Sequence, residues 1–301
     1  MKPGSGSPQE WGPYEQLFVR YDDDQKALWY HLAPRSRPCF NLDMLSELKQ
    51  FQRKVKMVNQ SATGSGADSL PIRYTVLASS VPGVFNLGGD LQLFSKLIRN
   101  GDREGLFGYA KACIDVLYPN SVNFEMPLTT ITLVQGDALG GGFEAAISSN
   151  VIIAEKSAKF GLPEVLFNLV PGMGAYSFLV RRTAPDLAEK IIMSGELLTA
   201  QKMFNLGLID EVVEDGQGEQ AVARFIQKHR KRSNAHAAMN RIKKCINPVT
   251  YEELIQITKI WVDAALELTS RDLRMIERLV QAQNRRAGLQ KPAPKVLEGF
   301  G

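Results

Sequence analysis

Two glutamates lie in apolar stretches of the sequence, where a carboxyl group is suited to moving protons. Glu144 comes just after the glycines at 140–142, and Glu164 lies within the largely apolar segment FGLPEVLF at 160–167. Burial in such surroundings makes a carboxylate costly to ionise and raises its pKa toward neutrality. A carboxyl group in that state can take up a proton and return it, which is general acid–base catalysis. Plainer roles are also open, Glu144 as an acid that favours a helix start and Glu164 as an exposed loop acid.

Two glycine-rich turns, Gly88-Gly89-Asp90 and Gly140-Gly141-Gly142, share one local design. Each follows an apolar segment and leads into an expected helix, so its backbone N–H groups lack helical partners. Two such turns brought together could direct two N–H donors at one oxygen atom and form an oxyanion hole. Phosphate binding is the alternative, but the second turn lacks the Lys-Ser or Lys-Thr pair of a P-loop and the spacing of a dinucleotide fingerprint. Either turn could also be purely structural.

Strands and helices must position these groups, and the hydrophobic pattern predicts an α/β protein with a helical C-terminal part. We expect strands at 14–21, 26–32, 72–78, 129–135 and 150–154. The acidic residues 22–24 suit a hairpin turn, Asn41 can cap a helix, the segment 81–90 is rich in turn residues, and 61–67 is expected to be a loop. Beyond Thr199 the pattern is mostly helical, with one expected apolar stripe formed by Leu254, Ile257, Trp261, Ala264, Ala265 and Leu268.

The chain length of 301 residues allows one large domain with appended parts. We expect a flexible tail at 1–12, a core at 13–215, a C-terminal helical region at 216–288 and a second tail at 289–301. The sequence has no apolar run of about eighteen residues and no apolar segment typical of a secretory signal near its start. These features predict a soluble, cytoplasmic protein with no membrane span.

Cysteine and histidine residues show no pattern of a metal or disulfide site. The three cysteines, Cys39, Cys113 and Cys245, are scattered and are expected to be small buried side chains. The three histidines, His31, His229 and His236, lie outside the glycine and glutamate motifs and are expected to be non-catalytic. The sequence therefore predicts neither a metal site nor a cofactor.

The net charge of +4 conceals a basic stretch with no acidic residue. Eight lysines and arginines lie between Arg224 and Lys244. Such a stretch can attract an anionic partner, such as an acidic carrier protein or a nucleotide-bearing thioester, and Arg181 and Arg182 are alternatives for the same role. Nucleic acid is not expected, because no aromatic interleaving or DNA-reading motif accompanies the charges. A solvated helix face remains an open interpretation.

Taken together, these motifs resemble the enoyl-CoA hydratase/isomerase (crotonase) superfamily over roughly residues 70–215. The matching segments are Gly88-Gly89-Asp90, Gly140–Glu144, Phe160–Glu164, Leu169–Gly174, Leu198–Ala200 and Gly207–Val213. The resemblance implies a spiral of ββα units with C-terminal helices that build trimers. It also implies that two backbone N–H groups hold a thioester enolate, here those of Gly89, with Gly88 beside it, and Gly141.

A narrower resemblance is to the diffusible-signal-factor synthases, through Arg37–Asn41, Pro127–Thr130, Phe160–Leu169 and Gly172–Tyr176. It implies that a 3-hydroxyacyl chain on acyl carrier protein is dehydrated and then hydrolysed to a cis-2-unsaturated fatty acid, a quorum-sensing signal. The segment around Arg35 departs from the hydratase pattern that helps to hold CoA, which favours a carrier-protein substrate. The family match places Met173, Trp261 and Leu279 in the acyl pocket, although ordinary helix packing is also open to them.

Two other functions remain open at this level. One is an enoyl-CoA hydratase of fatty-acid oxidation, and the other is a binding protein that docks a signalling partner such as a sensor kinase. Both glutamates and both glycine turns are present, which counts against binding as the sole role.

Overall fold

The computed structural model describes residues 11–61 and 70–286. The loop expected at 61–67 lies outside these ranges except for its first residue, as do the tail at 289–301 and most of the N-terminal tail. Trp11, which composition assigns to that tail, is buried and packs on Phe51, with ring centroids 6.4 Å apart. The packed part of the chain thus includes Trp11, because burial of its large apolar ring is strongly favourable.

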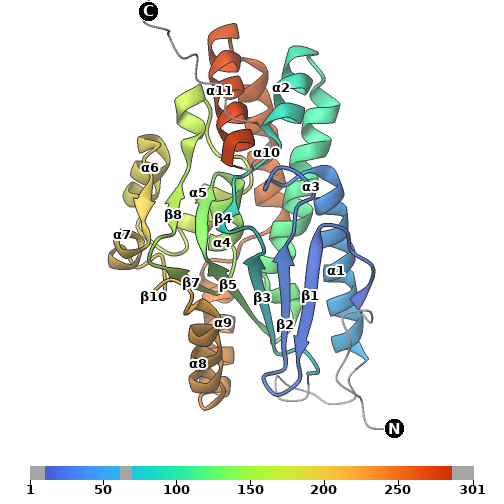
Figure 1. Cartoon of the computed structure of the whole chain (residues 1–301), viewed down its shortest axis with the longest axis vertical. Coiled ribbons are helices and arrows are strands. Elements are labelled where there is room, and N and C mark those ends of the chain that lie inside the picture. The colour runs from blue at the N-terminus through green and yellow to red at the C-terminus, as the bar shows by residue number, and fades with distance from the viewer. Residues whose placement is uncertain (1–10, 62–69, 287–301) are drawn as a thin grey trace, which may run out of the picture.

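Two sheets form the centre of the molecule (Figure 1). In the six-stranded sheet the order is β1 (Leu17–Asp22), β2 (Ala27–Leu32), β3 (Tyr74–Ser79), β5 (Thr129–Val134), β7 (Val151–Glu155) and β10 (Glu211–Val213). In the four-stranded sheet the order is β4 (Gly83–Asn86), β6 (Gly136–Leu139), β8 (Lys159–Gly161) and β9 (Leu198–Thr199). Among the strand pairs of the described residues, β1–β2 and β8–β9 are antiparallel and the others are parallel.

A repeated ββα unit explains how the two sheets are connected. The chain alternates between them, from β3 to β4, from β5 to β6 and from β7 to β8, and a helical segment follows each second strand. This arrangement confirms the expected spiral of ββα units. Because β4, β6 and β8 are parallel neighbours, the segments that follow them emerge at one edge of the smaller sheet. Those segments carry the first glycine turn, the second glycine turn and Glu164.

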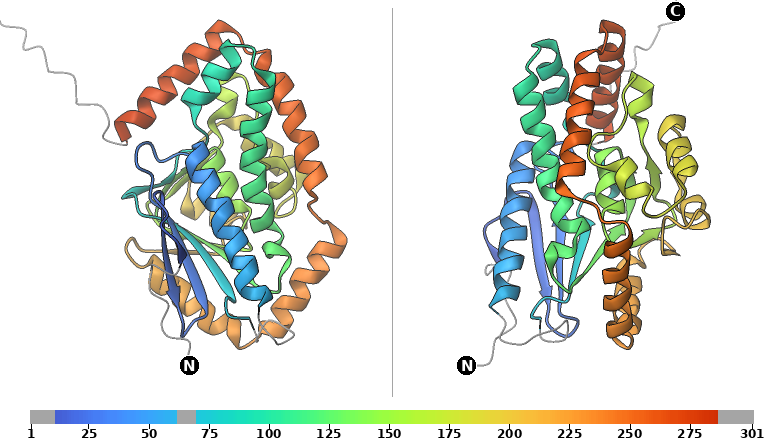
Figure 2. Two further views of the ribbon diagram at one scale, coloured as in Figure 1. Left: turned by 90° about the vertical axis from the view of Figure 1, so that its right-hand side faces the viewer. Right: turned by 180° about the vertical axis from the view of Figure 1, so that it is seen from behind.

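Helices cover the sheets on both sides and at both ends. Their bounds are α1 (Leu42–Gln60), α2 (Leu91–Arg99), α3 (Arg103–Ser121), η3 (Asn123–Glu125), α4 (Gly141–Ile147), η4 (Pro163–Phe167), α5 (Ala175–Leu179), α6 (Pro185–Ser194), α7 (Ala200–Asn205), α8 (Gly218–Arg230), α9 (Ser233–Ile246), α10 (Tyr251–Leu266) and α11 (Ser270–Arg286). Figure 2 shows that α2 and α11 lie at one end of the molecule and α8 and α9 at the other. A main core fills the space around α1, α3 and the sheets, a second lies under α8, and a third joins α2, α10 and α11.

Local sequence signals agree with several of these elements. The strands β1 and β2 form the expected hairpin, with Asp22, the last residue of β1, opposite Ala27. The side chain of Asn41 accepts a hydrogen bond from the N–H of Met44 at 2.9 Å, which caps α1 as expected.

Other elements differ from the sequence expectation. The turn-rich segment 81–90 contains the strand β4, and β9 and β10 interrupt the expected helical region near and beyond Thr199. These strands have two to four residues, too few for a recognisable alternation.

The prediction of an apolar stripe on α10 was partly wrong. Its buried residues are Leu254, Thr258, Val262 and Ala265, whereas Ala264 is exposed. Helix α10 packs on α3, and its buried residues follow one another at steps of three and four, so they form one face of the helix that does not include Ala264. Cys39 and Cys113 are buried as expected, but Cys245 is exposed because α9 buries none of its side chains.

No helix in the described ranges is long and apolar enough to cross a lipid bilayer.

Candidate active site

A single cavity of about 270 Å³ gathers the groups that the sequence singled out. Its lining is mostly apolar and comes from the first glycine turn, α3, the second glycine turn, η4, α10 and α11. The predicted site residues in this lining are Gly88, Gly89, Gly141, Glu144, Glu164, Met173, Trp261 and Leu279. Segments far apart in the sequence thus meet in one chamber, whose volume is close to the lower end of the range typical of ligand pockets.

Gly88 gives the first turn a shape that other residues rarely adopt. Its φ is +97°, in the left-handed region, and its N–H donates to Oδ1 of Asn86 at 2.7 Å. Its carbonyl accepts from the N–H of Phe40 at 2.8 Å. The N–H of Gly89, by contrast, donates no hydrogen bond within the described ranges. Gly89 is therefore the free donor of this turn, while the N–H of Gly88 is already engaged.

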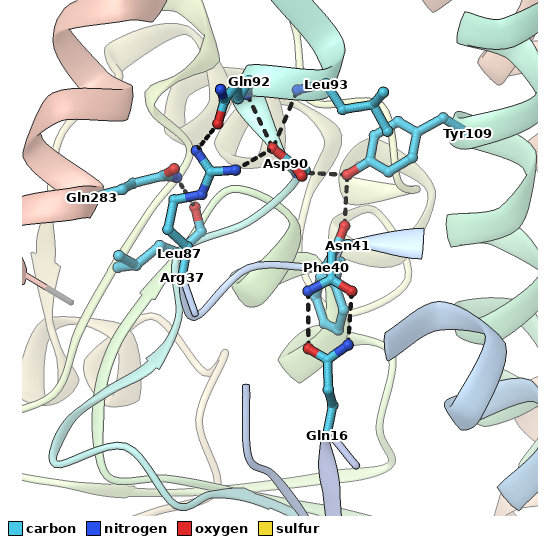
Figure 3. Close-up of polar contacts among 10 residues, drawn as sticks. All are labelled: Gln16, Arg37, Phe40, Asn41, Leu87, Asp90, Gln92, Leu93, Tyr109 and Gln283. Atoms are coloured by element: carbon cyan, nitrogen blue, oxygen red, sulfur yellow. Dashed lines mark hydrogen bonds and ion pairs between the residues drawn. The ribbon is translucent and has the colours of Figure 1, made fainter. Parts of the chain in front are cut away.

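A buried polar cluster holds the far side of this turn (Figure 3). The hydroxyl of Tyr109 accepts from the N–H of Asp90 at 2.6 Å and donates to the carbonyl of Phe40 at 2.8 Å. Arg37 pairs with Asp90 at 3.0 Å, and the same carboxylate caps α2. Burial raises the pKa of Tyr109 well above its usual value, so this hydroxyl stays protonated and keeps both contacts.

The second turn presents its N–H from the start of α4. Gly140 has a φ of +50° and donates to the carbonyl of Gly161 at 2.8 Å, which ties the turn to the neighbouring strand. Gly141 is the first residue of α4, so its N–H has no acceptor within the helix. A Cβ on Gly88 would lie 3.1 Å from the nitrogen of Gly141, which shows that the two turns touch. The free N–H groups of Gly89 and Gly141 are thus neighbours on the cavity wall, as an oxyanion hole requires.

Glu144 is buried and held in place by backbone donors. Its side chain is 1% exposed, and its Oε1 accepts from the N–H groups of Met173 at 2.7 Å and Ala175 at 2.9 Å. Burial raises the pKa of Glu144 to about 7, although the two N–H groups stabilise the charged form and oppose part of that rise. One oxygen is therefore fixed, and the carboxyl group can exchange a proton near neutral pH.

Glu164 completes a carboxyl pair. The residue as a whole is partly exposed, but its Oε2 is buried and has no hydrogen-bond partner in the described ranges. Burial, and then the negative charge of Glu144, raise the pKa of Glu164 to about 8. The two groups titrate as a pair, so one proton is shared between them near neutral pH.

Apolar side chains form the deeper part of the cavity. The indole of Trp261 lies 5.2 Å from the ring of Phe94 and donates from Nε1 to the carbonyl of Val170 at 2.9 Å. Met173 lies on the glutamate side, and Leu279 reaches the chamber from α11. This wall offers an acyl chain apolar contact and few polar partners.

The lining residues that sequence reasoning missed include three that can form polar contacts, Tyr109, Cys113 and Gln283. Tyr109 and Cys113 follow Leu106 on one buried face of α3 at steps of three and four residues, and this periodicity could have revealed them. Nothing comparable marks Gln283, which lies in a polar part of the sequence.

Several other candidates lie away from the cavity. The three histidines are not part of its lining. The basic stretch from Arg224 to Lys244 belongs to α8 and α9, at the opposite end from α2 and α11 (Figure 1). Arg181 pairs with Glu253, and Arg182 donates to backbone carbonyls, so both have structural partners. Among the described residues, no cluster of three or more His, Cys, Asp or Glu side chains could hold a metal ion.

Comparisons with known proteins agree with this fold. The family model of enoyl-CoA hydratase/isomerase matches residues 67–285. Methylglutaconyl-CoA hydratase of Rattus norvegicus is 32% identical over 171 residues, which cover 56% of this chain and 51% of that protein. Crotonyl-CoA hydratase of Syntrophomonas wolfei is 29% identical over 201 residues, covering 67% of this chain and 70% of that protein.

A solved structure shows the same fold. The enoyl-CoA hydratase from Bacillus halodurans has a TM-score of 0.71 and 22% identity, with 88% of this chain and 100% of that chain covered. The chain spans only about half the length of the methylglutaconyl-CoA hydratases that it matches. The extent of the family match and the shared fold lead to one conclusion: this chain belongs to the enoyl-CoA hydratase/isomerase family.

Proposed function

We propose that this protein converts a 3-hydroxyacyl chain on acyl carrier protein into a free cis-2-unsaturated fatty acid, a quorum-sensing signal. The observation that carries the proposal is the pair of buried glutamates with raised pKa values beside two free backbone N–H groups. Dehydration and thioester hydrolysis both need this combination of proton transfer and oxyanion stabilisation.

The first step is the loss of water. One glutamate carboxylate removes a proton from the carbon next to the thioester carbonyl, and negative charge moves onto the carbonyl oxygen. The N–H groups of Gly89 and Gly141 stabilise this enolate, at about 3–4 kcal/mol for one well-placed donor. The second carboxyl group protonates the 3-hydroxyl, which leaves as water, and the double bond forms.

The second step is hydrolysis of the thioester at the same site. A glutamate carboxylate takes a proton from water, whose oxygen attacks the carbonyl carbon. The two N–H groups then hold the tetrahedral oxyanion. When this intermediate collapses, the carbon–sulfur bond breaks, the thiol of the carrier leaves with a proton, and free acid remains. The site needs no separate nucleophile for this step.

Two features support a fatty acyl chain on a carrier protein. The cavity wall around Trp261 and Leu279 is apolar, as a fatty chain requires. In the segment that departs from the CoA-binding pattern, Arg35 pairs with Glu15 at 2.6 Å and Arg37 pairs with Asp90. Neither guanidinium is left without an acidic partner there, which weakens the case for a CoA phosphate at this segment.

The protein is also proposed to be a homo-oligomer. Helix α9 buries none of its side chains, and Met239, Ile242 and Ile246 on it are 52%, 49% and 79% exposed. An apolar face of this kind suits contact with a second copy. A sensor kinase remains a further candidate partner.

Hydration of an enoyl-CoA is the second candidate function. The two relatives described above are named as CoA-ester hydratases, and both glutamates would serve that reaction too. It differs from the first proposal in releasing no free acid.

Incubation with 3-hydroxydodecanoyl carrier protein, and in parallel with the CoA ester, followed by mass spectrometry, tests the proposal. We expect free cis-2-dodecenoic acid from the carrier substrate, and no product from Glu144→Gln or Glu164→Gln proteins that remain folded. A trans product still attached to its thioester would instead establish the hydratase alternative. If the protein binds both substrates but converts neither, both enzymatic proposals fail and only the role of a binding protein is left.

A further inference from the structure

We infer that Gln283 is a positioning residue. When α11 packs against the acyl chain, Gln283 holds the first glycine turn so that the Gly89 N–H points at the oxyanion. The inference deepens the proposed function and rests on it, because it assigns a role in the same cavity. According to this inference, the oxyanion is fully stabilised only when the acyl chain of the substrate is bound against α11.

The hydrogen bond of Gln283 to the first turn is buried and fixed in direction. The side chain is 7% exposed, and its Nε2 donates to the carbonyl of Leu87 at 2.9 Å (Figure 3). A carbonyl can only accept, so this contact decides which end of the amide faces Leu87. The Oε1 atom has no partner in the described ranges, so the amide contributes to this contact through its donor.

Leu87 is a sensitive place for such a contact. The next residue, Gly88, has a φ of +97°, a conformation that favours glycine, and it precedes the free N–H of Gly89. On the far side of Gly88, its carbonyl is held by the N–H of Phe40. On the near side, the carbonyl of Leu87 is held by Gln283. Together with the hydrogen bond from the Gly88 N–H to Asn86, these two contacts hold the peptide groups on both sides of Gly88 and so set the direction of the Gly89 N–H.

The other anchors of this turn come from the N-terminal half of the chain. They include Arg37, Pro38, Phe40, Asn86 and Tyr109. Within the described part of the chain, Gln283 is the one side chain of α8 to α11 that is hydrogen-bonded to residues 87–90. Its side chain therefore gives the C-terminal helices a direct hydrogen bond to the first turn of the oxyanion hole.

The same face of α11 also contacts the acyl chamber. Leu279 and Gln283 are four residues apart, so they lie one above the other on the helix, and both line the cavity. The earlier part of α11 is docked by Leu273 and Ile276 in the apolar core that also contains Phe94. Gln283 lies near the end of the helix, beyond these apolar residues, and contacts the first turn through its hydrogen bond to Leu87. An acyl chain packed on Leu279 stabilises this helical turn and, through Gln283, the carbonyl of Leu87.

The kinetic test compares Gln283→Met with Gln281→Met. Methionine keeps the length and volume of glutamine but removes the donor, and Gln281 is exposed on the same helix and outside the cavity lining. With 3-hydroxyacyl carrier substrates of four and twelve carbons, we expect Gln283→Met to lower kcat for the long chain about 10- to 100-fold with little change in KM. We expect a four-carbon chain to end before Leu279, so its kcat should fall less. Gln281→Met should match the unmodified protein.

Two kinetic results would overturn the inference. One is an unchanged kcat for the long chain in folded Gln283→Met protein. The other is a raised KM with unchanged kcat, because that pattern describes loss of acyl binding alone. Should Gln283→Met fail to fold, Gln283→Asn removes the contact by shortening the side chain and is judged by the same criteria.

Hydrogen–deuterium exchange separates this inference from the proposed function. The probe is the dodecyl thioether of pantetheine, which cannot be hydrolysed. In the unmodified protein it should protect both α11 and residues 87–90, and in Gln283→Met it should protect α11 alone. If the unmodified protein turns over no thioester, the proposed function fails while this measurement still decides the coupling. Equal protection of 87–90 in both proteins would refute the coupling.

Discussion

Gly88 and Gly141 lie so close together that the Cβ of any side chain on Gly88 would come within 3.1 Å of the backbone nitrogen of Gly141. The contact joins two turns that precede different helices, and it exists because β4 and β6 are parallel neighbours. It places the N–H groups of Gly89 and Gly141 on one wall of the cavity. Several consequences of this arrangement can be measured.

Removing the N–H of Gly141 should remove much of the oxyanion stabilisation. Proline is tolerated at the first position of a helix, so Gly141→Pro deletes the donor without disrupting α4. Because a Cβ at this position would meet the sulfur of Met173 at 2.3 Å, Gly141→Ala is the matched control for crowding. We expect Gly141→Pro to lower kcat about 100-fold or more relative to Gly141→Ala in steady-state assays. Equal activity of the two variants would show that this N–H is not a donor to the oxyanion.

The pH profile should report the carboxyl pair. Below the lower pKa of the pair both groups are protonated and no base remains, and above the higher pKa both are ionised and no acid remains. Because burial raises both pKa values, to about 7 and about 8, the plot of kcat/KM against pH should be bell-shaped around slightly alkaline pH. An acidic limb near the ordinary carboxyl pKa of 4.5 would contradict the burial argument.

Neutralising Glu144 should lower the pKa of Glu164. The negative charge of Glu144 is the second cause of the raised pKa of Glu164, after burial. In Glu144→Gln protein the charge is absent while the burial remains, so the pKa of Glu164 should fall but stay above 4.5. Carboxyl ¹³C chemical shifts followed through a pH titration measure this. An unchanged pKa would show that the two side chains do not interact.

Glu164 should weaken the fold at alkaline pH. Its raised pKa means that the folded protein holds this proton more tightly than the unfolded chain does, so stability falls as pH rises from about 4.5 through about 8. Glu164→Gln removes this loss, and at pH 9 it should raise the free energy of unfolding by on the order of 2 kcal/mol, since water screens part of the penalty.

The measurement for Glu164→Gln is thermal unfolding at pH 5 and pH 9. A gain at pH 9 that is absent at pH 5 is the expected result. Glu189→Gln, at an exposed position on α6, is the control and should show no such difference. A gain of the same size at both pH values would point to packing instead of ionisation.

Gly172 should control the position of Trp261. A Cβ on Gly172 would lie 2.6 Å from the indole ring, so Gly172→Ala must displace the ring that walls the acyl chamber. We expect kcat/KM for a twelve-carbon substrate to fall roughly 10-fold or more, with a smaller effect on a four-carbon substrate. Adding Trp261→Phe should restore part of the loss, because the smaller ring relieves the contact.

Gly108→Ala is the matched control for Gly172→Ala, since nothing lies within 4 Å of a Cβ at Gly108. Its kinetics should equal those of the unmodified protein. A Gly172→Ala protein with unchanged chain-length preference would show that Trp261 does not limit the acyl chamber.

Much of the site is readable from the sequence because its chemistry depends on local context. The apolar residues around Glu144 and Glu164 predict raised pKa values for these carboxyl groups, and the glycines that precede a helix predict free backbone N–H groups. The same is true of the α1 cap at Asn41 and of the β1–β2 hairpin. These features depend on residues a few positions apart, so one stretch of chain contains the information.

Only the tertiary structure decided which groups meet and which are already engaged. The N–H of Gly88 is taken by Asn86, which leaves Gly89 as the donor of the first turn. The short strands β4, β6 and β8 have no clear local pattern, yet their pairing brings the two turns and Glu164 to one sheet edge. The contact between Gln283 and Leu87 joins opposite parts of the sequence. Such relationships depend on contacts between segments that are far apart in the sequence, and a local pattern of residues does not determine which distant segments meet.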